Sequence, residues 1–198
     1  MIEVEKKFIL TSEQSARLIA DATLVGKKEI TDVYYDNATY DLTRGDKWLR
    51  KRNSRFELKL PIGDNDSGVF IYNELENDAE ICRTLGLDDS SPLEAVLKKA
   101  GYNPFCVCKT TRTKYTLGEF NLDLDKAEFD DFEYEVAEIE LMAESEEYTK
   151  AAERKIEKIA ASYGLSNEGV RGKIVAYIAR KRPQHFEALK QAWGDPHL

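Results

Sequence analysis

Carboxylates spaced two residues apart recur along the chain. The pairs are Glu3 with Glu5, Asp123 with Asp125, and Glu138 with Glu140. In a β-strand this spacing puts both carboxylates of a pair on one face, about 7 Å apart from the rise per residue. Divalent cations that prefer oxygen ligands can bridge such a pair directly or through water. Mg²⁺ or Mn²⁺ therefore suits these pairs, whereas zinc suits them poorly without His or Cys.

Basic side chains sort onto strand faces in the same way. The set comprises Lys7, Arg50, Arg52, Lys59 and Arg112. Arg and Lys are the side chains that hold phosphoryl oxygens. A closed sheet with acids on one wall and bases on the other would bind a metal and a polyphosphate together. The alternative is a half-exposed sheet with ordinary cross-strand ion pairs, which is favoured for any single pair but weakens for the whole set.

Histidine and cysteine offer little for catalysis. The two histidines, His185 and His197, follow the last recognisable strand, so a His base or a His-ligated metal is hard to build. Cys82, Cys106 and Cys108 form no C-x-x-C pair and are interpreted as buried or incidental free thiols. Asp, Glu, Lys, Arg and Tyr remain as the side chains available for chemistry.

The composition predicts one globular domain over residues 1–198. Hydrophobic residues make up 42% of the chain, which is enough for a sizeable core. The 37 acidic and 29 basic residues give a formal net charge of −8, which argues against nucleic-acid and anionic lipid partners. No apolar stretch approaches the roughly 20 residues that span a bilayer, and the N-terminus lacks the pattern of a signal peptide. We expect a cytoplasmic protein without a membrane partner.

Period-two alternation and helical spacing divide the chain into elements. Strands are predicted over residues 2–8, 24–36, 47–52, 56–60, 69–75, 105–117, 120–124 and 134–142. Helices are predicted over residues 11–22, 78–85, 93–100, 144–164, 170–181 and from 183 onward. A tight hairpin is expected at 53–55 and a flexible loop at 61–68. This order indicates an α+β fold built on antiparallel sheet.

Several sequence blocks carry a family resemblance. Glu3-Val4-Glu5-Lys6-Lys7 matches E-x-E-x-K, the N-terminal signature of the CYTH superfamily of triphosphate tunnel metalloenzymes. Further matching blocks follow in the family's order: Trp48-Leu49-Arg50-Lys51-Arg52, Glu57-Leu58-Lys59, Tyr72-Asn73-Glu74-Leu75, Arg112, Leu122-Asp123-Leu124-Asp125, Ala137-Glu138-Ile139-Glu140 and Gly172-Lys173-Ile174-Val175-Ala176-Tyr177. The sequence resembles this superfamily over nearly its whole length. Within it, the chain is most similar to the animal thiamine triphosphatases, including the tail Arg182-Pro183-Gln184-His185-Phe186.

The resemblance implies a closed antiparallel β-barrel, the triphosphate tunnel, with flanking helices and a lumen that holds Mg²⁺ and a triphosphate. The implied metal ligands are Glu3, Glu5, Glu74, Asp123, Glu138 and Glu140, with Mn²⁺ as a further possible ion. The implied phosphate-binding residues are Lys7, Arg50, Arg52, Lys59, Arg112 and Lys173. By similarity, Lys59 with Tyr72 activates the attacking water, a role that requires neighbouring cations to depress the pKa of Lys59.

Two positions bear on specificity. Trp48 shares the strand face of Arg50 and Arg52, so its indole either stacks on a thiazolium cation or closes the tunnel end by packing. Resemblance to the thiamine branch favours stacking. Thr110 stands where a Lys often precedes the strand's Arg by two residues in the wider superfamily, which weakens the transfer of how the terminal phosphate is held.

The sequence thus predicts Mg²⁺-dependent hydrolysis of the terminal phosphate of thiamine triphosphate, giving thiamine diphosphate and phosphate. One alternative is a broad inorganic tripolyphosphatase or nucleoside triphosphatase in the same tunnel. Another is a non-catalytic module that binds polyphosphate. A small-molecule triphosphate is the expected partner and a monomer the expected state, while the number of metal ions stays open.

Overall fold

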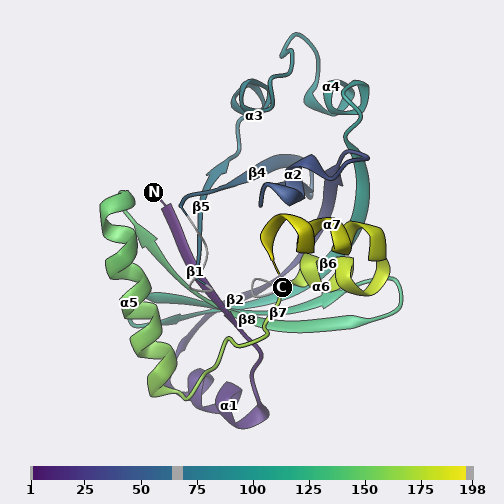
Figure 1. The fold of residues 1–198 in the computed structure, drawn as a ribbon. Coiled ribbons are helices and arrows are strands. Elements are labelled where there is room, and N and C mark those ends of the chain that lie inside the picture. The colour runs from purple at the N-terminus through teal and green to yellow at the C-terminus, as the bar shows by residue number, and fades with distance from the viewer. Residues whose placement is uncertain (1, 64–68, 195–198) are drawn as a thin grey trace.

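A closed antiparallel barrel forms the centre of the computed structural model, which describes residues 2–63 and 69–194 (Figure 1). Around the barrel the strands follow the order β1-β5-β4-β3-β2-β6-β7-β8. The strands are β1 (Ile2–Phe8), β2 (Thr23–Asp36), β3 (Trp48–Arg52), β4 (Arg55–Pro61), β5 (Val69–Leu75), β6 (Asn103–Leu117), β7 (Phe120–Glu128) and β8 (Glu133–Ala143). The predicted antiparallel barrel is confirmed. The largest difference in a strand boundary is at β7, which runs four residues beyond the predicted end at 124.

Helices flank the barrel and connect its strands. They are α1 (Ser12–Asp21), α2 (Asp41–Arg44), α3 (Asp78–Leu85), α4 (Leu93–Lys99), α5 (Glu146–Ser162), α6 (Lys173–Lys181) and α7 (Pro183–Trp193). The sequence missed α2, because a single turn of four residues carries no readable periodicity. Helix α6 begins at Lys173, later than predicted, since Gly169 is left-handed (φ 67°) and Gly172 is an extended N-cap.

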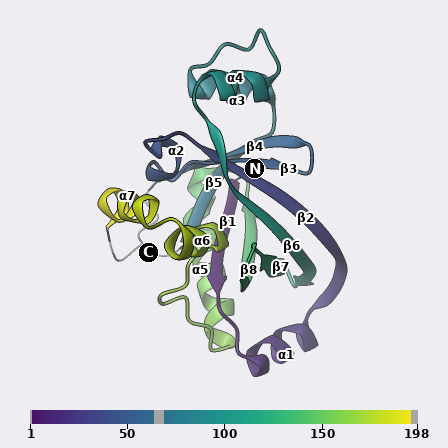
Figure 2. The same ribbon diagram turned by 90° about the vertical axis from the view of Figure 1, so that its right-hand side faces the viewer.

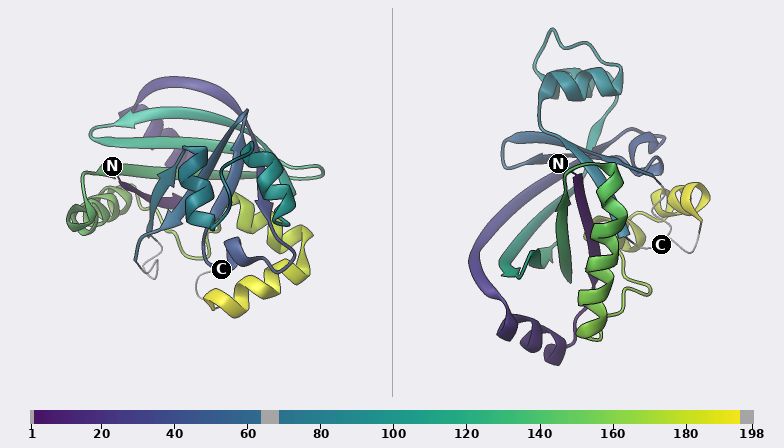
Figure 3. Two further views of the ribbon diagram at one scale, coloured as in Figure 1. Left: turned by 90° about the horizontal axis from the view of Figure 1, so that it is seen from above. Right: turned by 90° about the vertical axis from the view of Figure 1, so that its left-hand side faces the viewer.

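The helices lie on different sides of the barrel. Figure 3 shows α5 along the outside next to β1, and α5 also contacts β8. Figure 2 shows α3 and α4 standing together beyond β4 at one end, and α6 beside α7. Helix α7 also packs on α2, which follows β2. This contact brings the C-terminal helix close to the loop that leads into β3.

Alternation along the strands separates an apolar outer face from a charged inner face. On β7 and β8, Leu122 and Ile139 are fully buried against Ile156 of α5. Their neighbours in the sequence, Asp123 after Leu122 and Glu138 before Ile139, are buried on the opposite face. Because the side-chain period of a strand is two, a slip of one residue would exchange these faces. Packing against α5 therefore fixes which carboxylates enter the barrel.

Three further expectations concern residues outside the charged set. The three cysteines are free and buried, as predicted, and Cys108 Sγ lies 3.4 Å from Thr110 Oγ1. His185 is buried between α7 and the barrel, whereas His197 lies outside the described residues. Most of the loop predicted at 61–68 also lies outside them. In the described part of the chain, no helix is both long enough and apolar enough to cross a membrane.

Candidate functional site

Charged and aromatic side chains surround a cavity of about 160 Å³ inside the barrel. The predicted site residues that line it are Glu3, Glu5, Lys7, Trp48, Arg50, Arg52, Lys59, Tyr72, Glu74, Arg112, Glu138 and Lys173. Asp123 joins this set through its ion pair with Arg112, and Glu140 lies opposite Glu5 in the β1–β8 register. The structure therefore brings together every predicted site residue.

The strand order explains how acids and bases are distributed. Strands β7, β8 and β1 are consecutive around the barrel, and they carry the paired carboxylates predicted from sequence. Arg50 and Arg52 lie on β3, three strands away from either edge of this acidic wall. Lys7 and Arg112 depart from a strict division, because Lys7 is on β1 and Arg112 contacts carboxylates on β7 and β8. The expected separation of the two walls is thus only partly correct.

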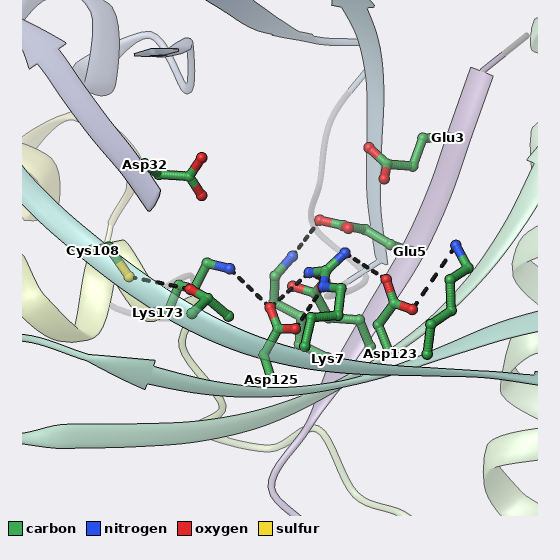
Figure 4. Close-up of polar contacts among 12 residues, drawn as sticks. Glu3, Glu5, Lys7, Asp32, Cys108, Asp123, Asp125 and Lys173 are labelled. Atoms are coloured by element: carbon green, nitrogen blue, oxygen red, sulfur yellow. Dashed lines mark hydrogen bonds and ion pairs between the residues drawn. The ribbon is translucent and has the colours of Figure 1, made fainter. Parts of the chain in front are cut away.

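Three buried carboxylates outside the predicted set hold the cations in place. The Nε and Nη2 of Arg52 donate to Asp32 at 2.8 and 3.0 Å. Glu57 accepts from Arg50 Nε at 2.6 Å. Asp125 accepts two hydrogen bonds of 2.6 Å from Arg112 and one of 2.8 Å from Lys173 (Figure 4). We call Asp32, Glu57 and Asp125 the anchoring carboxylates.

The sequence carried only a weak signal for the anchoring carboxylates. Glu57 shares a strand face with Lys59, and Asp125 belongs to one of the i, i+2 pairs, whereas the strand of Asp32 carries no predicted site residue. Their role becomes clear from the arginine that lies directly opposite each of them on the adjacent strand. The register sets Asp32 opposite Arg52, and Asp125 opposite Arg112. The short turn after Leu117 implies the second pairing, whereas the first runs across the connection that contains α2 and cannot be inferred from periodicity.

The acids predicted as metal ligands also meet cations. Lys59 is ion-paired with Glu3, and Lys7 is ion-paired with Glu5. Three further acids contact arginine: Asp123 and Glu138 with Arg112 at 2.5 and 2.7 Å, and Glu74 with Arg50 at 2.7 Å. Each cation of the site therefore faces at least one carboxylate.

Some of these carboxylates repel one another. Burial, followed by the charge of Glu3 and then of Glu5 and Asp123, raises the pKa of Glu140 to about 7. Burial and the charge of Glu5 also raise the pKa of Glu3. Burial raises the pKa of Asp123, although Arg112 acts in the opposite direction. We call Glu3, Asp123 and Glu140 the open carboxylates, because their local surroundings disfavour their negative charge.

The chemistry of the open carboxylates fits a hard cation. Asp123 Oδ1 is buried without a hydrogen-bond partner, and the Nζ of Lys114 is 3.9 Å away. A divalent ion would occupy such an oxygen and relieve the mutual repulsion of the acids. In the described part of the chain, no three His, Cys, Asp or Glu residues already form a metal-binding group. An ion would therefore have to replace some of the existing ion pairs.

Lys59 differs from its predicted electrostatic state. Burial acts against its charge, but Glu5 and Glu3 outweigh burial and raise its pKa. The expectation that neighbouring cations depress this pKa is wrong for this structure, because Glu5 and Glu3 each raise the pKa of Lys59 more than Arg50 lowers it. Its Nζ sits 5.4 Å from the centroid of the Tyr72 ring, so the two residues are adjacent as expected. Lys59 is a charged ammonium here.

Aromatic residues close one part of the cavity. Trp48 lines the cavity, as its strand parity predicts, and its ring lies edge-on to Trp193 with centroids 6.0 Å apart. The Nε1 of Trp48 donates to Asp46 Oδ1 at 2.8 Å, and the hydroxyl of Tyr72 donates to the same oxygen at 2.9 Å. Sequence reasoning missed Asp46 and Trp193. Trp193 belonged to a predicted helix, but nothing in its spacing indicated the cavity.

A closed antiparallel barrel with a lumen of paired acids and bases defines the class of triphosphate tunnel folds. The family model of the CYTH domain matches residues 1–171, and the chain belongs to this family. CYTH enzymes of this class act on triphosphates and depend on a metal ion. Among curated proteins, none matches the chain significantly.

Solved structures share the fold at low sequence identity. PH1819 from Pyrococcus horikoshii is 22% identical, with a TM-score of 0.67, and the match covers 90% of this chain and 99% of that one. HpAC1 from Hippeastrum, a proposed adenylyl cyclase with a dominant triphosphatase activity, is 18% identical, with a TM-score of 0.57 and coverage of 91% and 96%. A chain of the Schizosaccharomyces pombe Mediator head module is 13% identical, with a TM-score of 0.51 and coverage of 82% and 96%. These likenesses concern the fold.

Proposed function

We propose that this chain hydrolyses the terminal phosphate of an organic triphosphate in a metal-dependent reaction, with thiamine triphosphate as the substrate. The observation that carries the proposal is the cationic lining of the cavity, held by buried carboxylates on neighbouring strands. Donors fixed before the substrate arrives stabilise transferring phosphoryl charge without reorganisation. Membership of the CYTH family supports a triphosphate as the ligand.

The proposed phosphate-binding residues form a ring of cations around the cavity. They are Lys7, Arg50, Arg52, Lys59, Arg112 and Lys173. The contact of Asp32 with Arg52 is bidentate, as is that of Asp125 with Arg112, so these guanidinium planes are fixed in orientation. Arg52 keeps its Nη1 group for a phosphoryl oxygen pair, whereas Arg112 also donates to Asp123 and Glu138 and would have to release one of these contacts. The anchoring carboxylates would then act through the cations and not on the substrate.

The proposed metal ligands are the predicted acids Glu3, Glu5, Glu74, Asp123, Glu138 and Glu140. Among these, the open carboxylates have the strongest electrostatic reason to accept a divalent ion. Mg²⁺, or alternatively Mn²⁺, would neutralise phosphoryl oxygens when bound. Glu74 and Glu138 accept hydrogen bonds from arginine and, unlike Asp123, leave no buried oxygen without a partner among the residues that the structure describes, so we expect their part in metal binding to be smaller.

Lys59 and Tyr72 remain the proposed pair that activates the attacking water. Glu5 and Glu3 are the groups that hold the pKa of Lys59 high. With these two carboxylates neutralised, burial and then the charge of Arg50 would lower the pKa of Lys59, opposed by Glu74. Lys59→Ala should therefore lower kcat much more than substrate affinity. A loss of affinity alone would contradict the role of Lys59 in activating water.

The aromatic part of the cavity favours an organic head group over inorganic tripolyphosphate. Trp48 and Trp193 both line the cavity, and an indole face attracts an organic cation such as thiazolium. Trp48→Ala should reduce kcat/KM for thiamine triphosphate about tenfold while changing that for tripolyphosphate little. An equal loss for both substrates would reduce Trp48 to a packing residue.

Substrate profiling tests the proposal most directly. We expect kcat/KM to be highest for thiamine triphosphate and lower for tripolyphosphate and ATP, with phosphate release that needs Mg²⁺ and stops in EDTA. Equal or better turnover of tripolyphosphate would instead favour a broad triphosphatase. Metal-dependent binding without phosphate release would favour a polyphosphate-binding module. The proposal also includes a cytoplasmic monomer with a small-molecule partner, which size-exclusion chromatography with light scattering and cell fractionation would check.

A further inference from the structure

Asp46 connects two strands that do not pair with each other. Its Oδ1 accepts hydrogen bonds from Trp48 on β3, at 2.8 Å, and from Tyr72 on β5, at 2.9 Å. In the barrel, β4 lies between β3 and β5. This one oxygen therefore links Trp48, in the aromatic part of the cavity, to Tyr72, which lies beside Lys59.

The backbone around Asp46 fixes where this carboxylate lies. Asp46 follows α2 and has a left-handed conformation, with φ of 52°, which Asp and Asn tolerate better than most residues. Its amide donates to Thr43 O at 3.0 Å, and the amide of Lys47 donates to Leu42 O at 2.9 Å. Thr43 is itself fastened to β2, because its amide and hydroxyl both donate to Asp36. These hydrogen bonds fix the turn, which carries Asp46, to the end of β2.

The same short segment also supports Trp193. The Nε1 of Trp193 donates to the carbonyl of Arg44 at 3.0 Å. Residues 44–46 therefore hold the polar edges of both indole rings that line the cavity. Of these contacts, only those of Asp46 reach Trp48 and Tyr72 together.

We propose that Asp46 is a positioning residue that sets the Trp48 ring and the Tyr72 hydroxyl as one unit. The inference rests on the proposed function, in which Trp48 contacts the head group and Tyr72 lies at the reaction site. Because both donors share one oxygen, rotation of either ring away from its observed position breaks its hydrogen bond. Asp46 would thereby couple recognition of the head group to placement of the reacting phosphate.

A spectroscopic test reads the position of Trp48 without any substrate. The chain has two tryptophans, so a ¹H–¹⁵N spectrum contains two indole N–H resonances, and Trp193→Phe assigns them. Asp46→Ala should shift the Trp48 indole resonance upfield, as expected for a lost hydrogen bond to a carboxylate. Asp46→Asn retains an oxygen acceptor and should restore most of the shift. An unchanged Trp48 resonance in Asp46→Ala would overturn the proposal.

A kinetic test asks whether one residue acts through two others. Asp46→Ala should raise KM for thiamine triphosphate and lower kcat, each about fivefold, as expected for one lost hydrogen bond per ring. In a Trp48→Phe background, Asp46→Ala should no longer raise KM. In a Tyr72→Phe background it should no longer lower kcat. Fully additive effects in both backgrounds would contradict the coupling.

A matched variant separates the carboxylate from the backbone. Asn53 is also left-handed, with φ of 54°, and it lies in the turn between β3 and β4, outside the cavity lining. Asn53→Ala imposes a similar conformational penalty without removing a contact to Trp48 or Tyr72. It should lower the melting temperature as Asp46→Ala does but leave the indole resonance and KM unchanged. Equal kinetic losses in the two variants would assign the effect to strain and overturn the proposal.

The two tests distinguish the positioning role from the enzymatic function. If no triphosphate is hydrolysed but Asp46→Ala still shifts the Trp48 resonance, the proposed function fails and the structural part of the inference stands. If thiamine triphosphate is hydrolysed but neither the resonance nor the kinetic coupling responds, the positioning role alone fails.

Discussion

The anchoring and open carboxylates belong to the same barrel but meet different neighbours. The anchoring residues Asp32, Glu57 and Asp125 each lie directly opposite an arginine on the adjacent strand. The open residues Asp123 and Glu140 lie opposite other acids, Glu138 and Glu5, across β8 and its neighbours. Opposite charges across a strand pair are stabilising and like charges are destabilising. Register alone does not decide the electrostatic state of a carboxylate, because Glu5 and Glu138 lie opposite these same acids. Burial opposes their charge, but neighbouring cations, led by Lys7 for Glu5 and by Arg112 for Glu138, outweigh it and lower their pKa values.

This difference suggests a division of work within one layer of acids. The side chains of Asp32 and Asp125 are fully buried, and each is bidentate to an arginine. Burial opposes the charge of Asp32, but hydrogen bonds from Arg52 and the charge of Arg50 lower its pKa. The pKa values of Glu3 and Glu140 move the opposite way. We therefore expect the anchoring set to stabilise the folded barrel, and the open set to carry repulsion that a bound cation would relieve.

The largest expected effect is the loss of an anchoring carboxylate. Asp125→Ala would remove the bidentate partner of Arg112 and the ion pair of Lys173. Both cationic side chains are largely buried. We expect the free energy of unfolding to fall by about 3–5 kcal/mol, as for other buried pairs that lose one partner. Urea unfolding, followed by circular dichroism, measures this loss. Asp125→Asn should recover part of it through the remaining oxygen acceptor.

The matched deletion on the open side should behave in the opposite way. Glu140→Ala removes a carboxylate whose charge is opposed by burial, Glu3 and Glu5. We expect the free energy of unfolding at pH 8 to stay constant or to rise. If Glu140→Ala and Asp125→Ala destabilise the protein equally, the distinction between the two sets is wrong.

The sequence predicted the faces of the strands but not their pairing. Alternation around Asp123 and Asp125 places both carboxylates in the lumen, and the two look equivalent in the sequence. Only the β6–β7 register, which sets Asp125 opposite Arg112 and Asp123 opposite Lys114, makes one an anchor and leaves the other with an unsatisfied oxygen. This register follows from the two-residue turn between Leu117 and Phe120, which periodicity alone does not use. The register that sets Asp32 opposite Arg52 depends instead on packing across the longer connection that contains α2.

Local patterns also failed where function depends on short or distant elements. The turn of α2 and the left-handed Asp46 after it span too few residues for a periodic signal, yet they fasten Trp48. Trp193 ends α7, which packs on α6 and α2, and from there it lines the cavity. Only the family resemblance identified Lys173 and Tyr72 as site residues. Strand alternation could not, because Lys173 begins a helix and Tyr72 is an uncharged residue outside the acid and base pattern.

The pH dependence of stability provides a second, intermediate test. The pKa of Glu140 is about 7 in the folded protein, above its ordinary value of 4.5. The folded state therefore keeps a proton that the unfolded state releases, and this contribution to stability is complete below pH 4.5 and lost as pH rises through 7. Glu140→Gln should unfold at a higher temperature than wild type at pH 8, by an amount worth about 1 kcal/mol. Melting curves from pH 4.5 to 8 measure the difference, which should vanish at the acidic end.

Mg²⁺ sharpens the same comparison. If the open carboxylates bind the ion, Mg²⁺ should raise the melting temperature of wild type more at pH 8 than at pH 5.5, because binding requires the charged form of Glu140. Glu140→Gln should lose most of that pH dependence. An equal response to Mg²⁺ in both proteins at both pH values would place the ion elsewhere.

The smallest effect is expected for an exposed ion pair outside the barrel, whose N–O distance equals that of a buried pair in the site. Lys155 and Glu119 form an ion pair of 2.7 Å, the same separation as Arg112 and Glu138, but both side chains are about half exposed. Water screens the exposed pair, so Glu119→Gln should change the free energy of unfolding by less than about 0.5 kcal/mol. Urea unfolding at low and at 1 M salt checks this value. A loss as large as that of Asp125→Ala would mean that separation alone governs these pairs, and that the burial and register invoked for the anchoring carboxylates are not the cause of their stabilising role.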